Sequence, residues 1–114
     1  MTLIEVIQRA NVLRPNALPD EQKAAWVFEL EGKVAEVMGT DVPVNTFPED
    51  AKLLMCAPYD NIYELYLAAM IDYYNQDGAL YENDMVMFNA AFDEARAWWR
   101  RNNRPASRGN WRVK

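Results

Sequence analysis

The stretch Tyr59–Gln76, YDNIYELYLAAMIDYYNQ, decides the fold of this chain of 114 residues. At helical spacing, its small and polar residues make one narrow stripe, and almost every other position is large and apolar; the stripe comprises Asn61, Glu64, Ala68, Asp72 and Asn75. A helix with so wide an apolar face has to be covered on several sides. Asp60 is the expected N-cap, and Gly78 is expected just past the other end in the left-handed conformation. The sequence therefore predicts a central helix over residues 60–76, covered by other helices or by neighbouring subunits.

Two helices are predicted before the central one. Thr2 and Glu5 make a capping box, because the hydroxyl and the carboxylate each satisfy a free N–H of the first turn. The helix that they open covers residues 2–13 and ends before Pro15, since the residue preceding a proline is pushed out of the helical region. A second helix over residues 20–38 starts with acidic side chains at the positive end of its dipole.

A fourth helix is predicted over residues 80–103. It follows the central helix after a turn of only a few residues, so the two form an antiparallel hairpin. Leu65 and Phe92 are expected near the centre of the core of this hairpin. The fold class predicted is all-α: a four-helix domain over residues 1–104 with a long antiparallel C-terminal helical hairpin.

Residues 40–58 interrupt the helical pattern with three prolines and form a long loop. Loops of this length are often functional, so Val42, Val44 and Phe47 are predicted to contact a neighbouring subunit. The alternative is a loop that folds back over its own core. Cys56 is expected to be a small buried hydrophobic residue.

Charge divides the chain into an acidic body and a basic end. Residues 1–95 carry all 17 acidic residues and five basic ones, a net charge of −12, and the remaining residues carry seven basic ones. The residues predicted to bind a partner are Arg100, Arg101, Arg104, Arg108, Trp111 and Arg112. Residues 105–114 are expected to be a flexible basic tail that cannot fold alone. Basic residues with tryptophan suit nucleic acid or an acidic groove on another protein, and a solvated end without function is the third possibility.

Several kinds of chemistry are not indicated. The chain has no histidine and one cysteine, so no catalytic residues, metal ligands or cofactor site are predicted, and the protein is not expected to be an enzyme. No stretch has the length of a membrane span. Tyr59, Tyr63, Tyr66, Tyr73 and Tyr74 are expected in the core or, where their hydroxyl groups need water, in a subunit interface.

The chain resembles the head–tail connector, or adaptor, proteins of tailed bacteriophages. The residues that carry the resemblance are Leu13-Arg14-Pro15-Asn16, Asp20-Glu21-Gln22-Lys23, Ala57-Pro58-Tyr59-Asp60, Tyr63, Tyr66, Ile71-Asp72-Tyr73, Tyr81-Glu82-Asn83 and Met87-Phe88-Asn89-Ala90-Ala91-Phe92. These motifs are structural rather than catalytic, and they cover most of the chain.

The resemblance implies a helical subunit of a ring beneath the portal of the virion. Its expected partners are the portal protein, the next neck or tail protein, further copies of itself, and DNA that passes through the channel without sequence-specific binding. The expected location is the virion neck, assembled in the cytoplasm of the host bacterium, with no membrane involved. Two alternatives stay open: a small nucleic-acid-binding or regulatory helical protein that uses the basic C-terminal segment, and a helical partner-binding module outside any virion.

Overall fold

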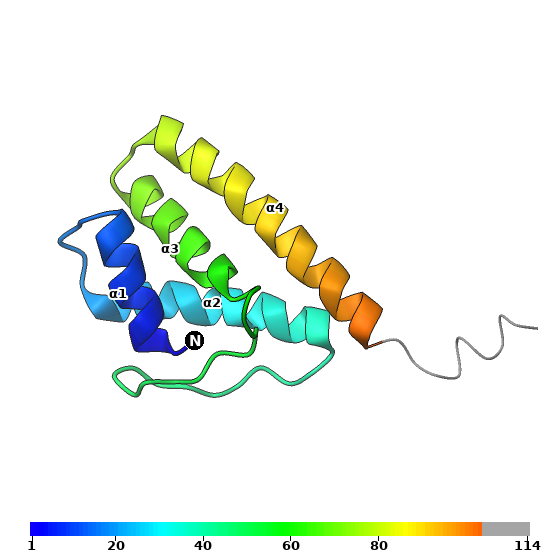
Figure 1. The fold of residues 1–114 in the computed structure, drawn as a ribbon. Helices are drawn as coiled ribbons and strands as arrows, with labels where there is room; N and C mark the ends of the chain where they lie inside the picture. Colours follow the sequence, from blue (N-terminus) through cyan, green and yellow to red (C-terminus); the bar gives the residue numbers. More distant parts are fainter. Residues whose placement is uncertain (104–114) are drawn as a thin grey trace, which may run out of the picture.

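The computed structural model describes residues 1–103, and their regular structure is helical. The four helices are α1 (Leu3–Leu13), α2 (Asp20–Met38), α3 (Asn61–Tyr74) and α4 (Gly78–Asn102) (Figure 1). The predicted all-α class with four helices is confirmed, and no predicted boundary is wrong by more than two residues. The predicted basic tail, residues 105–114, lies outside the described residues.

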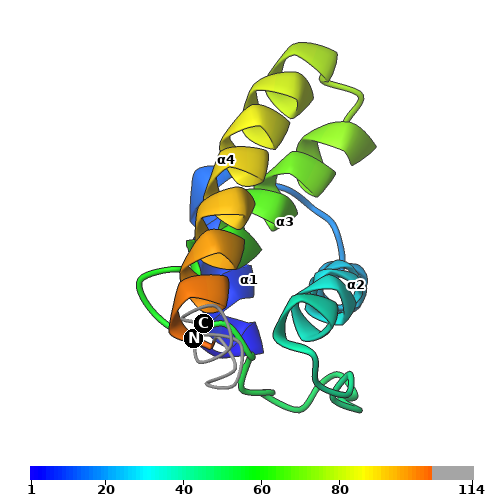
Figure 2. The ribbon, with the colours of Figure 1, turned by 90° about the vertical axis from the view of Figure 1, so that its right-hand side faces the viewer.

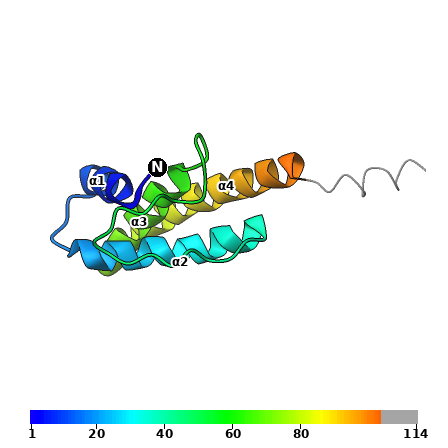
Figure 3. The same ribbon diagram turned by 90° about the horizontal axis from the view of Figure 1, so that it is seen from below.

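Helix α3 is the centre of the domain. It contacts each of the other three helices, most extensively its hairpin partner α4, and α1 and α2 lie on different sides of it (Figures 2 and 3). Every residue from Ile62 to Asp72 is buried or half-buried. The polar stripe of α3 faces two arginines. Glu64 lies 3.7 Å from Arg9 of α1, and Asp72 lies 3.0 Å from Arg14, the residue directly after α1. The prediction of a helix covered on several sides is confirmed.

The N-cap of α3 is Asp60 as predicted, but without the expected hydrogen bond, and the predicted glycine cap at the other end is wrong. Asp60 occupies the N-cap position, but its carboxylate caps no backbone N–H and lies 3.6 Å from the amino group of Met1. The left-handed residue after α3 is Gln76, with φ of 59°, and Gly78 is the first residue of α4. The reason is Asp77, whose carboxylate accepts a hydrogen bond from the N–H of Leu80 at 3.2 Å. An aspartate is a strong N-cap, so α4 starts directly after it and leaves glycine no separate capping role.

The connection between α2 and α3 runs back along α2 toward the start of α1 (Figures 1 and 3). We call its residues 51–55 the strap. The strap pairs with the start of the chain, where the N–H of Leu3 donates to the carbonyl of Ala51 at 2.8 Å and the N–H of Leu53 donates to that of Met1 at 3.1 Å. Ala51, Leu53 and Met55 are buried. For this part of the connection, the alternative of a loop folded over its own core is correct.

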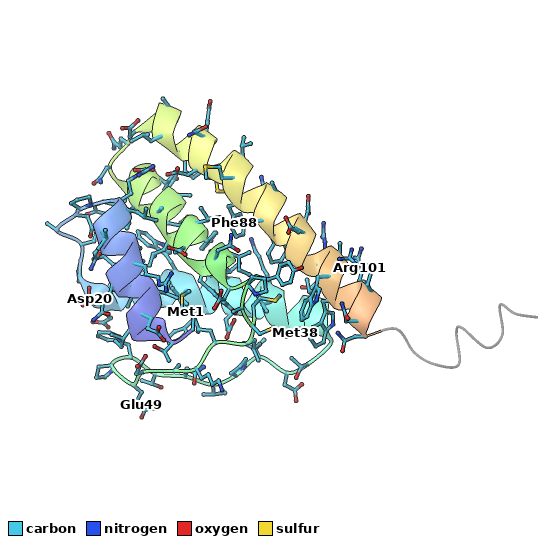
Figure 4. The ribbon with its side chains drawn as sticks, viewed as in Figure 1. Met1, Asp20, Met38, Glu49, Phe88 and Arg101 are labelled. Carbon is cyan, nitrogen blue, oxygen red and sulfur yellow. The ribbon has the colours of Figure 1, made fainter. Side chains whose placement is uncertain are left out.

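Three side chains expected in the core lie at its edge or outside it. Leu65 and Phe92 are half-buried, because the central positions of the hairpin belong to neighbours such as Leu67 and Phe88. Cys56 is exposed, since the alternation along the strap turns residues 51, 53 and 55 inward and the next residue outward. Figure 4 shows Phe88 on the side of α4 that faces α3.

We expect Ile71→Val to lower the free energy of unfolding by about 1 kcal/mol, because one buried methyl group is lost from a fully buried site. Urea denaturation measures the difference. Val86→Ala removes more carbon from an exposed position of α4 and should change stability by less than about 0.5 kcal/mol. Equal effects of the two substitutions would mean that α3 is not the buried centre.

Candidate functional site

The last turn of α4 carries the described part of the predicted partner site. Arg100 and Arg101 are exposed there, at the negative end of the helix dipole, and Figure 4 shows Arg101 at the far end of α4. Trp98 just before them is half-buried and stacks on Tyr59, with ring centroids 4.9 Å apart. Trp98 therefore supports the fold, whereas the two arginines are exposed to solvent.

The other predicted residues of this site are Arg104, Arg108, Trp111 and Arg112, and they lie outside the described residues. Their role in docking stays a prediction.

The predicted interface residues of the connection fall into two groups. Val44 is 98% exposed and Val42 is also exposed, so both are accessible to another molecule. Phe47 is half-buried and packs against the core of its own domain. The loop is thus anchored by its aromatic residue while it presents two valines, and their contact with a neighbouring subunit stays a prediction.

An open hollow of about 680 Å³ lies at the tip of the α3–α4 hairpin. We call it the tyrosine hollow; its lining residues are Tyr73, Tyr74, Gln76, Asp77, Gly78 and Tyr81. Tyr73 and Tyr74 are 63% and 60% exposed, and the rings of Tyr73 and Tyr81 lie 5.4 Å apart. Three aromatic rings beside a carboxylate suit a ligand that combines a flat or apolar group with positive charge.

Sequence reasoning did not find the tyrosine hollow. Aromatic residues at helical spacing usually belong to the core, and Tyr63 and Tyr66 do. Tyr73 and Tyr74 occupy the last turn of α3, which extends past its covering neighbours. Their position directly before the turn into α4 was the signal that could have separated them from the buried pair.

A partly buried charge cluster joins three parts of the fold just below this tip. The Nε of Arg14 donates to both carboxylate oxygens of Asp72, at 3.2 and 3.0 Å, and a terminal nitrogen donates to both oxygens of Asp84, at 3.0 and 3.1 Å. Asp72 belongs to α3 and Asp84 to α4, and both carboxylates are buried. Arg14 therefore fastens the end of α1 to the hairpin; from the sequence, its only expected role was to end the first helix.

The electrostatics of the cluster are unbalanced, because one guanidinium faces two carboxylates. Burial raises the pKa of Asp84 to about 6, helped by its hydrogen bond with Asp72 and opposed by the charge of Arg14. The same contacts raise the pKa of Arg14, chiefly through its hydrogen bond with Asp72, so the cation is permanent. Burial thus favours the protonated form of Asp84.

We expect Asp84→Asn to flatten the dependence of stability on pH. The pKa of Asp84 rises from an ordinary 3.8 to about 6 on folding, so the folded state binds more protons between these values. The stability that this group contributes is fully present below pH 3.8 and is lost as pH rises through about 6. The loss amounts to about 3 kcal/mol. Urea denaturation at several pH values between these limits measures it, with exposed Glu82→Gln as the control. Parallel curves for the wild type and Asp84→Asn would contradict the expectation.

A second buried network holds the strap. Glu31 of α2 is only 1% exposed; its carboxylate accepts hydrogen bonds from the hydroxyl of Tyr63 and, at 2.8 Å, from the N–H of Leu54. The Tyr63 hydroxyl in turn accepts from the N–H of Met55 at 2.9 Å. Burial raises the pKa of Glu31, while the two hydrogen bonds lower it. The network therefore ties α2, α3 and the strap together at one point.

Residues 1–103 contain no group of three or more histidine, cysteine, aspartate or glutamate side chains arranged to hold a metal ion. No helix in this described part is long and apolar enough to cross a membrane. Comparisons with models of protein families, with curated proteins and with solved structures found no match. The chain's own geometry thus leaves three surfaces to explain: the end of α4, the valines of the connection and the tyrosine hollow.

Proposed function

We propose that this protein is a structural subunit of the neck of a tailed bacteriophage. It forms a ring beneath the portal, joins the DNA-filled head to the tail, and carries out no catalysis. The observation that carries the proposal is the placement of exposed apolar side chains at two separate ends of a small helical domain. One group is the pair Val42 and Val44, and the other is the tyrosine hollow. Two different surfaces suit head-to-tail contacts between copies, which generate rings when the rotation closes.

The resemblance of the sequence to head–tail connector proteins supports the same assignment, and charge is compatible with it. Residues 1–95 carry a net charge of −12, so DNA moving through a channel formed by this body is repelled rather than bound. The exposed Arg100 and Arg101, together with the basic residues that follow, are the proposed contact with the portal protein.

A nucleic-acid-binding or regulatory protein is the second candidate, because the same two exposed arginines lead into a basic segment. Phosphate contacts make binding fall steeply as salt concentration rises. Trp98 weighs against this candidate, since its ring stacks on Tyr59 instead of standing free to stack on a base.

We expect truncation after Asn103 to abolish or sharply weaken attachment to the portal and to leave the melting temperature nearly unchanged. The helices and their core are formed by residues before the truncation. Co-sedimentation of full-length and truncated protein with the cognate portal ring measures attachment, and negative-stain microscopy shows whether a ring is added. Lys33→Glu, an exposed charge reversal on α2, is the control.

Two outcomes would decide against the proposal. Equal portal binding by both proteins would refute the docking role of the C-terminal segment. Absence of portal binding, together with salt-dependent binding of duplex DNA that the truncation removes, would favour the nucleic-acid candidate.

A further inference from the structure

The tyrosine hollow and the basic C-terminal segment stand at opposite ends of α4. The helix has 25 residues, so its ends are about 36 Å apart. Arg108 lies six residues after Asn102, and even fully extended this stretch spans only about 21 Å. Arg108 therefore cannot reach the tyrosine hollow of its own chain, whereas Arg108 of another copy meets no such limit.

The chemistry of the two surfaces is complementary. The tyrosine hollow offers three aromatic rings and the carboxylate of Asp77, in a body with a large excess of acidic residues. Residues 104–114 contain four basic side chains and one tryptophan. Arginine binds over tyrosine rings through cation–π attraction, and tryptophan and arginine are the side chains that most often anchor an interface.

We propose that the tyrosine hollow of one copy binds the basic segment 104–114 of a second copy. The contact is head-to-tail, so each copy gives its segment to one neighbour and receives a segment from another. This contact between copies deepens the proposed function. The contact itself does not depend on that proposal, but the closure of the copies into a ring does. The segment cannot occupy the hollow and the portal at once, so the contact belongs to the protein before it meets the portal.

The test uses two variants of the full chain that each break one half of the contact. The hollow variant is Tyr73→Ser with Tyr74→Ser, at exposed positions; the segment variant is Arg108→Glu with Arg112→Glu. In sedimentation velocity over a range of concentrations, we expect each variant to associate at least about tenfold more weakly than the wild type. In a mixture of the two variants, the intact segment of the hollow variant can bind the intact hollow of the segment variant. The mixture should therefore form dimers that do not extend further.

Photo-cross-linking identifies the site directly. Trp111 is replaced by photoreactive benzoylphenylalanine, and isotopically labelled and unlabelled protein are mixed before irradiation. We expect intermolecular cross-links to the peptide around Tyr74 and Tyr81, and their loss in the hollow variant. Val86→Ser, at an exposed apolar position of α4 outside the hollow, is the control and should cross-link like the wild type.

The inference fails if both variants associate like the wild type, or if the cross-links join residues elsewhere. It also fails if the wild type stays monomeric at millimolar concentration without intermolecular cross-links. Portal co-sedimentation reports on the proposed function alone. If the protein does not bind the portal but its copies still associate, only the proposed function fails. If it binds the portal but its copies do not associate, only the present inference fails.

Discussion

Replacing Arg14 by methionine should lower the free energy of unfolding by about 3 kcal/mol at neutral pH. The substitution keeps the apolar stem and removes the guanidinium, so Asp72 and Asp84 are left as two neighbouring buried carboxylates without a cation. Replacing a whole buried ion pair by apolar residues often costs little stability. Removing only one partner costs much more, because the remaining buried charge is uncompensated. Chemical denaturation at pH 7 measures the loss.

Arg9→Met is the matched control for this substitution. Arg9 also reaches from α1 to a carboxylate of α3, but its side chain is 57% exposed and lies 3.7 Å from Glu64. Exposed pairs contribute about 0–1 kcal/mol, so the control should change little. Adding Asp84→Asn to Arg14→Met should restore part of the lost stability, since one of the two orphaned charges disappears. A loss below 1 kcal/mol for Arg14→Met, or no rescue, would mean that the cluster is solvated and does not fasten the hairpin.

The fold was predictable from local sequence signals. The capping box at Thr2 and Glu5 is present as expected, and Gly39 ends α2 in the left-handed conformation. Apolar periodicity correctly placed α3 at the centre. These features depend on residues within a few positions of one another, which is the range over which caps and helical faces are decided.

The buried polar partners could not be predicted in the same way. Arg14 pairs with residues 58 and 70 positions away, and Glu31 bonds to Tyr63 across 32 positions. Periodicity tells which face of a helix is polar, but not which distant residue covers that face. The sequence therefore revealed the polar stripe of α3 but not the arginines that lie against it.

The same limit explains why the tyrosine hollow was not predicted from the sequence. Tyr66 and Tyr73 are the same residue type on the same helix, yet one is buried and the other is largely exposed. The difference arises because α3 ends where its neighbours no longer cover it. The Arg14 cluster lies directly beneath this point and holds α1, α3 and α4 in register, so it positions the tyrosine hollow without being part of it.

Glu31→Ala should have the largest effect of the substitutions considered, a loss of about 3–5 kcal/mol of unfolding free energy. It leaves the hydroxyl of Tyr63 and the N–H of Leu54 without their acceptor inside the core, and it opens a cavity at a site that is 1% exposed. Each buried donor left unpaired costs about 1–3 kcal/mol. The strap should detach first, because its hydrogen bonds to α2 and α3 both depend on this carboxylate or on the hydroxyl beside it. Hydrogen exchange at the Leu54 and Met55 amides should therefore accelerate more than exchange within α4.

A double-mutant cycle separates the network from simple loss of packing. Tyr63→Phe removes the hydroxyl that donates to Glu31 and accepts from Met55, so Glu31→Ala and Tyr63→Phe together should cost less than the sum of the single losses. Glu36→Ala, an exposed position on the same helix, should change stability by less than about 0.5 kcal/mol.

The raised pKa of Glu31 sets the sign of its pH dependence. Burial disfavours the ionised carboxylate, so the stability that Glu31 contributes falls as the pH rises above the ordinary pKa of a glutamate. Glu31→Gln should therefore weaken the fall of stability with pH even though it leaves one hydrogen bond unmade. Additive losses in the cycle, together with unchanged exchange at Leu54, would show that the strap is held by its buried apolar side chains and not by the carboxylate.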